Sequence, residues 1–333
     1  MKGRPITHTP RSFHLSPTNV EGVIGKRLMV ILRSPGCIYF RSENTACTFC
    51  GFRHLTSSQL EIPDEAYAEQ LAAALEQVPT DGQSIIELNI YNSGNFFCDA
   101  ELSARARHLV GEFLSGCNGL LAVSVDSRPE FITSTNLAEF RSAVALPQQA
   151  IFVGIGLEVF DDSIRENLLN KHFRRSTFRN SLATLQNAGY GALIYIMVKP
   201  VPMSDEDALD QVISAGAFVQ EEASRLSLPY RFALEPTFVV EDTPLARLYR
   251  RGLYSPPTLE LVTQAAARLA HFGPVNIGLW EEELPVLAKP DSNSRDSILA
   301  AIQAFNCSQD LSVLLIDDTI QSDLSPEFPL ICS

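Results

Sequence analysis

The sequence predicts an α/β fold, a partial or complete parallel (β/α) barrel, and three observations support this prediction. Short stretches rich in Val, Ile and Leu recur along the 333 residues, and amphipathic stretches separate them. Most of the short stretches are apolar throughout rather than alternating, which is typical of strands buried on both faces of a parallel sheet. The length suits one barrel-type domain, and 45% hydrophobic with 20% charged residues is ordinary globular composition.

The strands and helices follow from hydrophobic periodicity. The stretch 62–78 has an acidic first turn, and the stretch 99–116 ends at a glycine, which are helix start and stop signals. The predicted strands are 28–33, 85–91, 120–125, 151–156, 192–198, 231–239, 275–279 and 311–316. The predicted helices are 62–78, 99–116, 161–170, 177–189, 204–226 and 258–273.

Composition and charge divide the chain into three parts. Residues 1–27 are predicted to form an N-terminal basic arm, 28–283 the barrel, and 284–333 a small C-terminal α/β extension that begins at the polar stretch 284–297. The net charge of −13 opposes non-specific attraction to nucleic acid. Because the chain shows neither a signal peptide nor an apolar run long enough for a bilayer, we expect a cytoplasmic protein with no membrane contact.

Three of the seven cysteines, Cys37, Cys47 and Cys50, follow the first predicted strand. This is where a parallel barrel places its chemistry. A zinc site could use them together with His54, and Cys47 with Cys50 could form a redox pair. A third alternative is that the cysteines are buried, inert thiols, but this explains poorly why three of them lie in one polar loop. A four-iron cluster held by three thiolates would leave one iron open to bind a reactive ligand.

The cysteine spacing resembles that of the radical S-adenosylmethionine (SAM) superfamily, in its Elp3-like branch with nine residues between the first two cysteines. Phe49 precedes the last cysteine, as is typical there. The stretches "YNSGNFFCDAE", "SVDSRPEFIT", "VGIGLEVFDDSIRENLLNKHF" and "GALIYIMVKP" are similar to strand-end motifs of the archaeosine synthase radical SAM subunit and its relatives. The resemblance implies a barrel of the radical SAM type, with a [4Fe–4S] cluster on Cys37, Cys47 and Cys50 and with SAM as second cofactor.

The resemblance also implies contacts to SAM. Ser93, Gly94 and Asn95 would bind its amino group, and Gly permits close approach of backbone to a ligand. Asp126 and Arg128 would contact its ribose and carboxylate, because the guanidinium fork suits a carboxylate. Relatives tend to have Glu in place of Asp126, so the reach of this carboxylate differs.

Four further residues are weaker candidates. Gly154 and Gly156 lie in one predicted strand, where glycine marks close approach of a ligand or a bend, and they would face adenine or accommodate a helix. Cys98 and Lys199 are candidate catalytic residues, since a thiol near a radical can donate hydrogen and a strand-end Lys can touch substrate or SAM. Packing is the usual role of a lone buried cysteine.

The sequence leaves three functions open. In the first, reductive cleavage of SAM gives a 5′-deoxyadenosyl radical that triggers C–C or C–N cleavage in a ribosomally made precursor peptide, as in a splicease. This reading is favoured by the acidic body, and it implies a leader-binding partner. The second is tRNA modification of the archaeosine synthase type, and the third a non-enzymatic zinc-binding module. Either enzyme would need an electron donor such as flavodoxin or ferredoxin.

Overall fold

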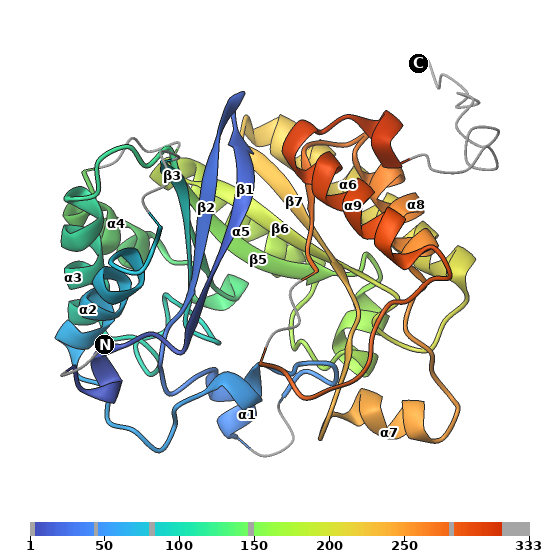
Figure 1. Ribbon diagram of the computed structural model, residues 1–333, viewed down its shortest axis with the longest axis horizontal. Helices are drawn as coiled ribbons and strands as arrows, with labels where there is room; N and C mark the ends of the chain where they lie inside the picture. Colours follow the sequence, from blue (N-terminus) through green and yellow to red (C-terminus); the bar gives the residue numbers. More distant parts are fainter. Residues whose placement is uncertain (1–3, 43–45, 80–83, 146–149, 280–282, 315–333) are drawn as a thin grey trace.

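The structure, a computed structural model, describes residues 4–42, 46–79, 84–145, 150–279 and 283–314 (Figure 1). Eight strands form a curled half-barrel sheet in the order β1-β2-β3-β4-β5-β6-β7-β9. Only the β1–β2 pair of this sheet is antiparallel. The predicted α/β class with a partial parallel barrel is therefore confirmed. The strands are β1 (Ser12–Val20), β2 (Val23–Ile31), β3 (Ile85–Tyr91), β4 (Ala122–Asp126), β5 (Ile151–Glu158), β6 (Gly191–Val198), β7 (Tyr230–Pro236) and β9 (Val275–Ile277).

The sheet begins earlier in the chain than predicted. Residues 12–20, assigned to a basic arm, form the edge strand β1, and the expected boundary at residue 27 falls inside β2. The sequence of β1 is only partly apolar and contains Pro17, which an edge strand tolerates because the missing N–H costs no ladder hydrogen bond. The basic arm is thus part of the sheet over most of its length.

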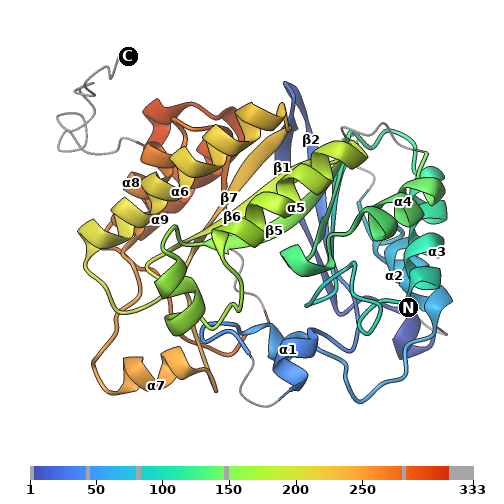
Figure 2. The ribbon, with the colours of Figure 1, turned by 180° about the vertical axis from the view of Figure 1, so that it is seen from behind.

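The helices cover the outer face of the sheet, and Figure 2 shows α5 and α6 lying across it. None of the described helices is long and apolar enough to cross a bilayer. The predicted helix 161–170 is a single π-helical turn, Ile164–Leu168. The helices are α1 (Ile38–Arg41), α2 (Asp64–Leu75), α3 (Ala104–Ser115), α4 (Ser134–Ala143), α5 (Arg175–Ala188), α6 (Asp205–Leu226), α7 (Pro244–Arg250), α8 (Leu259–Leu269) and α9 (Arg295–Ser308).

The two faces of the sheet differ in chemistry. Side chains such as Leu88 and Ile90 point outward into the core beneath the helices and are fully buried. The inner face carries charges. At its base, Glu87 accepts from Arg27 at 2.7 Å and from Arg231 at 2.5 Å. Burial alone would raise the pKa of Glu87, but Arg231 and Arg27 lower it to about 2.

The C-terminal segment completes this domain. A two-stranded sheet joins β10 (Val286–Ala288) to β8 (Val239–Val240), and α9 packs into the main hydrophobic core through Ile302 and Phe305. Asn306 and Gln309 use their side-chain amides to pair the N–H and C=O groups of Ile277 and Val275. The free edge of β9 is therefore covered by amide side chains rather than by another strand.

The last predicted strand, 311–316, is wrong. Residues Leu311–Leu314 form a 3₁₀ helix, and residues 315 and 316 lie outside the described part of the chain. Leu311 and Val313 pack against the main core, and Leu314 is buried in it. A 3₁₀ turn after a helix places apolar residues on the core much as a short strand would, so the apolar run alone does not separate the two.

Candidate functional site

The three cysteines of the predicted metal site lie in one loop beyond the C-terminal end of β2. Cys37 immediately precedes α1, and the backbone N–H of Cys50 donates to the carbonyl of Cys47 at 3.3 Å. All three side chains are partly exposed and none forms a disulfide. In Figure 1 this loop and α1 lie at the end of the half-barrel to which the parallel strands point. The structure thus places the thiols where a barrel enzyme carries its chemistry.

Loops from two other strands hold the Cys47–Cys50 turn. The N–H of Thr48 donates to the carbonyl of Leu169, after β5, at 3.2 Å, and the N–H of Leu245 in α7 donates to the carbonyl of Thr48 at 3.2 Å. Phe49 packs against apolar clusters on both sides of the turn. The turn is therefore positioned by the protein itself.

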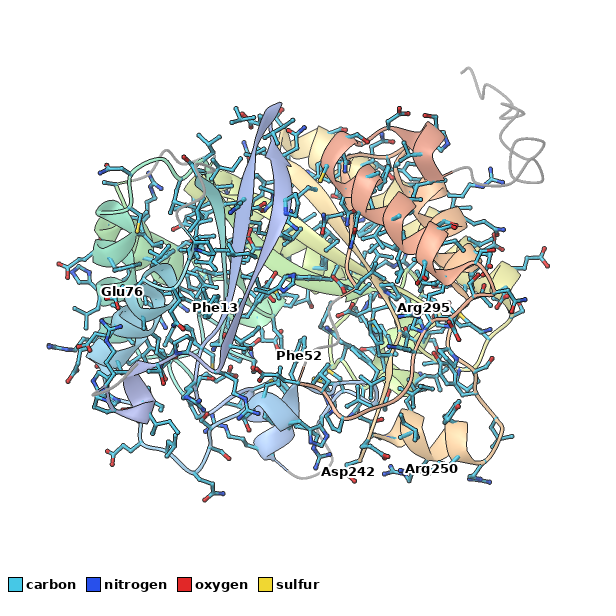
Figure 3. The ribbon with its side chains drawn as sticks, in the orientation of Figure 1. Phe13, Phe52, Glu76, Asp242, Arg250 and Arg295 are labelled. Atoms are coloured by element: carbon cyan, nitrogen blue, oxygen red, sulfur yellow. The ribbon has the colours of Figure 1, made fainter. Side chains whose placement is uncertain are left out.

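The segment before α7 binds the same loop. Arg53 donates to the carbonyl of Asp242 at 3.1 Å, and a ring nitrogen of His54 lies 3.0 Å from the carbonyl of Glu241. Figure 3 shows Asp242 and Arg250 close together at this end of the molecule. His54, the fourth ligand of the zinc interpretation, thus has a backbone contact of its own.

The environment of Cys37 and Cys50 favours the neutral form of these two thiols in the free protein. Burial, together with the charge of Glu101, raises the pKa of Cys37 to about 11. Burial and the nearby Cys47 raise the pKa of Cys50 to about 12. Metal ligation requires thiolates, so loading this site would release protons.

The donor set suits an iron–sulfur cluster better than a closed metal site. The charge of Cys47 contributes to the raised pKa values of both Cys37 and Cys50, so these two thiols lie within electrostatic range of Cys47. Among the described residues, no three His, Cys, Asp or Glu side chains already stand at metal-binding spacing. Soft thiolates are the usual ligands of such clusters, and three of them leave one iron open.

The loop after β3 lies against the first cysteine. The N–H of Cys37 donates to the carbonyl of Ser93 at 3.2 Å, and the Asn95 amide lies 3.5 Å from the Cys37 sulfur. The Ser93 hydroxyl and both amide atoms of Asn92 are buried without a partner. Buried unpaired polar groups are uncommon in proteins and here suit a polar ligand. The structure thus brings Ser93, Gly94 and Asn95 to the first cysteine, and their contact with SAM stays a prediction.

Glu101, which the sequence analysis did not select, connects these two loops. Its Oε1 accepts the N–H of Ile38 at 2.9 Å and the side-chain amide of Asn95 at 2.6 Å, and its Oε2 accepts the N–H of Asn95. The carboxylate also fills the space beside Gly94, where a Cβ would overlap it. Glu101 is the sixth residue after Asn95, and in the sequence it resembles an ordinary residue before a helix.

Arg128 is held by its surroundings. Its guanidinium contacts Glu130 at 2.5 Å and the carbonyl of Lys171, and it lies 4.0 Å above the Tyr39 ring. The N–H of Arg128 donates to the Asn95 side chain at 2.9 Å. The residue is near the cysteine loop, as the resemblance requires, but its guanidinium already has partners.

Asp126 and the two glycines of β5 face the interior of the half-barrel. Oδ1 of Asp126 accepts from the hydroxyl of Tyr195 at 2.9 Å and occupies the space where a Cβ on Gly154 would stand. A Cβ on Gly156 would likewise overlap Glu158, which pairs with Lys171 at 2.7 Å. In the structure these glycines make room for carboxylates of this chain.

The two weaker catalytic candidates are packed or paired. Cys98 is 4% exposed, and burial together with Glu101 raises its pKa to about 11. Lys199 has a left-handed backbone with φ of 57°, and its ammonium pairs with Asp205 at 2.6 Å. Its carbonyl accepts from Tyr254, which anchors the end of β6.

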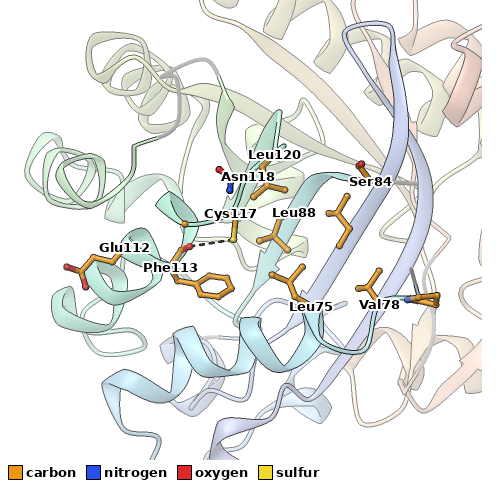
Figure 4. Close-up of a pocket in the computed structure, with 12 residues that line it drawn as sticks. Leu75, Val78, Ser84, Leu88, Glu112, Phe113, Cys117, Asn118 and Leu120 are labelled. Carbon is orange, nitrogen blue, oxygen red and sulfur yellow. Dashed lines mark hydrogen bonds between the residues drawn. The ribbon is translucent and has the colours of Figure 1, made fainter. Parts of the chain in front are cut away.

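A pocket of about 790 Å³ lies elsewhere (Figure 4). It is formed by the C-terminal ends of α2 and α3 and the first residues of β3, including Leu75, Phe113 and Ile85. This is the opposite end of the strands from the cysteine loop. None of the predicted site residues lines the pocket, so it has no link with the candidate chemistry.

Comparisons with known proteins agree with the fold. No model of a known protein family matches the chain. An uncharacterized protein of Methanocaldococcus jannaschii is 28% identical over 239 residues, 71% of this chain and 62% of the relative. Archaeosine synthase subunit beta of Methanosarcina acetivorans is 28% identical over 291 residues, 85% of this chain and 76% of the relative. The Thermococcus kodakarensis subunit of the same name is 25% identical, covering 74% and 73%.

Among solved structures, the Elp3 protein of the archaeon Methanocaldococcus infernus superposes with a TM-score of 0.53 at 14% identity. The match covers 72% of this chain and 59% of that one. The chain thus spans less than two thirds of the first relative and of this structure. The superposition supports the curled, mostly parallel half-barrel fold of this chain.

Proposed function

We propose that this chain is a radical SAM enzyme that acts on a tRNA nucleoside, in the manner of an archaeosine synthase beta subunit. One observation carries the proposal. The loop with Cys37, Cys47 and Cys50 is hydrogen-bonded to the loop with Ser93 and Asn95 at the C-terminal end of a parallel half-barrel. Curated relatives at 25–28% identity bear the archaeosine synthase name and support tRNA as the substrate class.

The cysteines would hold a [4Fe–4S] cluster, and Ser93, Asn95 and the orphaned Asn92 would bind SAM. When bound, the two cofactors supply an electron and a 5′-deoxyadenosyl radical. The chain's own part is positioning. Glu101 fixes the two loops against each other, and the side chains of Thr48 and Asn170 attach the turn to the loop after β5. The fixed polar environment keeps the reacting groups aligned and limits the access of water.

The relatives favour tRNA over the precursor peptide that the acidic body had suggested. The negative charge of the body argues only against non-specific RNA binding, and a recognition surface can be supplied by another subunit. We therefore propose a partner subunit for RNA recognition, because the relatives are named as beta subunits. A flavodoxin or ferredoxin would deliver the electron.

The test uses protein purified and reconstituted without oxygen. With strong reductant and SAM, the protein should form 5′-deoxyadenosine. Adding tRNA isolated from cells that lack this gene should increase the yield, and a modified nucleoside should appear in the digested tRNA by mass spectrometry. Protein that binds zinc and never iron would contradict the cluster, and turnover with a precursor peptide but not with tRNA would contradict the substrate.

A further inference from the structure

Four polar side chains gather on the inner face of the half-barrel. Asn89 of β3, Asp126 of β4, Tyr195 of β6 and Glu235 of β7 all project inward, because each alternates along its strand with residues that face the helices. We call these four residues the inner acidic site. The sheet places them above the Arg27–Glu87–Arg231 group at the base and on the way to the cysteine loop.

Two carboxylates and two tyrosines share this region. The Tyr195 hydroxyl lies 2.9 Å from Asp126 and 3.2 Å from the Tyr91 hydroxyl, and the Asn89 amide nitrogen lies 3.3 Å from the Tyr91 hydroxyl. The Tyr195 hydroxyl has one proton, so it satisfies only one acceptor. The carbonyl oxygen of Asn89, a residue 6% exposed, is buried without a partner.

Among the described residues, none donates a hydrogen bond to the carboxylate of Glu235. Its carboxylate occupies the space where a Cβ on residue 278 would stand. A glycine at position 278 is therefore needed to accommodate Glu235. Burial first, and then the neighbouring carboxylates Glu158 and Asp126, raise its pKa to about 7. Glu158 is already neutralised by Lys171, and Glu87 by two arginines. When ionised, Glu235 therefore has no ion-pair partner among the described residues.

The inner acidic site is also less filled than the outer core. Tyr91, Asp126, Tyr195 and Glu235 keep part of their surface accessible, whereas Leu88 on the outer face of β3 is 1% exposed. A protein interior is normally packed without gaps. The two carboxylates are thus partly accessible, so a ligand that donates hydrogen bonds can reach them.

We propose that the inner acidic site binds a protonated nitrogen group of the substrate. This proposal rests on the proposed function and names the chemistry of the substrate part that enters the half-barrel. A protonated amine supplies several donors and one positive charge, which matches two carboxylates and the free Asn89 oxygen. An unpaired buried carboxylate is costly, and a bound cation removes that cost. A neutral or anionic group would leave Glu235 unpaired.

A metal ion is the competing occupant. Carboxylate and amide oxygens also bind Mg²⁺, which prefers six oxygen ligands at short distance. The described residues contain no set of three acidic, His or Cys side chains at that spacing. Two carboxylates and one amide oxygen would leave a magnesium ion dependent on bound water for most of its ligands, so magnesium is included as a comparison in the experiment below.

The experiment uses reconstituted protein with SAM and measures its melting temperature with propylammonium chloride. Propanol, sodium chloride at equal ionic strength and magnesium chloride are the comparison additives. We expect a saturable rise in Tm with propylammonium alone, and loss of most of that rise in Glu235→Gln and Asp126→Asn. Glu112→Gln, an exposed residue of α3, should respond like the wild type.

Each other outcome overturns the proposal. An equal response to propanol, an unchanged response in Glu235→Gln, or stabilisation by magnesium instead would each do so. With tRNA as substrate, Glu235→Gln should lower kcat/KM at least tenfold while substrate-free cleavage of SAM continues. Absence of SAM cleavage in the wild type would instead contradict the proposed function, so the two failures are distinguishable.

Discussion

The carboxylate of Glu101 accepts the backbone N–H of Ile38 at 2.9 Å, one residue after Cys37. Because the same carboxylate accepts from the backbone and side chain of Asn95, it joins the cysteine loop to the loop after β3. The relative position of the two loops is thus fixed by one buried side chain, which is 2% exposed.

Replacing Glu101 by Ala should destabilise the protein even without a cofactor. The change leaves buried N–H groups unpaired, and each such loss costs about 1–3 kcal/mol of unfolding free energy. Urea denaturation of the apoprotein measures this cost, and iron per chain after reconstitution should fall as well. Glu112→Ala on the surface of α3 is the matched control and should change neither quantity. Equal stability of the two variants would refute the role of Glu101.

Gly94→Ala should have a similar effect for a steric reason. A Cβ at this position would overlap Glu101 and come within 2.8 Å of the Cys37 backbone nitrogen, which cannot move aside freely. Gly116→Ala is a suitable comparison, since its Cβ would meet only a carbonyl at 3.4 Å. We expect a lower Tm and lower iron content for the first variant and wild-type values for the second.

Changing any one of Cys37, Cys47 or Cys50 to Ala should abolish formation of 5′-deoxyadenosine. Three thiolates are the fewest that leave a single open iron, so loss of one removes the cluster or its reactive corner. Cys307→Ala, in α9 far along the chain, should retain activity. The readouts are deoxyadenosine by chromatography and the broad cluster absorbance. Equal loss in all four variants would show that the triad has no special role.

Glu87 should make the protein sensitive to acid. Its folded-state pKa of about 2 lies below the usual 4.5, so the unfolded chain binds the proton more readily. The stabilisation is therefore complete above pH 4.5 and is lost as the pH falls towards 2. Glu87→Gln should abolish this contribution and cost about 3–5 kcal/mol near pH 7, because two partly buried arginines lose their charged partner. Urea titrations at several pH values test both statements.

Glu235→Gln should raise the stability of the protein above neutral pH, whereas Glu87→Gln should lower it. The pKa of Glu235 is raised in the folded state to about 7, so the folded protein holds the proton more tightly. Stability then falls as the pH rises from about 4.5 to 7. A neutral amide avoids the ionised form, so ligand-free Glu235→Gln should be more stable than wild type at pH 8. The two proteins should converge at pH 4, and a destabilised variant at pH 8 would contradict the assignment.

The sequence predicts much of the sheet because its central strands are buried on both sides. Residues 85–91 coincide with β3, and 192–198, an uninterrupted apolar run, lie within β6. The strand at the sheet edge and the last described element were harder to predict. The strand β1 contains Pro17 and polar residues, and the 3₁₀ helix Leu311–Leu314 has the apolar composition of a strand.

The candidate site was predictable where chemistry and spacing coincide, as at Cys37, Cys47 and Cys50. Glu101, Tyr195 and Glu235 were not found, because a single Glu or Tyr within an apolar or helical stretch carries no local signal. The roles of Tyr195 and Glu235 appear only when the sheet aligns the strands from β3 to β7. For Arg128 the motif could be identified in the sequence, but the contacts of its guanidinium with Glu130 and the Lys171 carbonyl could not be predicted.

The amide side chains of Asn306 and Gln309 on the edge of β9 have a consequence for synthesis. They come from α9, near the end of the described chain, so they leave the ribosome long after the strand whose backbone they satisfy. Until then, a nascent chain presents the free N–H and C=O groups of Val275 and Ile277 to any neighbouring strand. Prematurely terminated products that end before residue 306 should therefore associate with one another through this edge, whereas full-length chains block it from within.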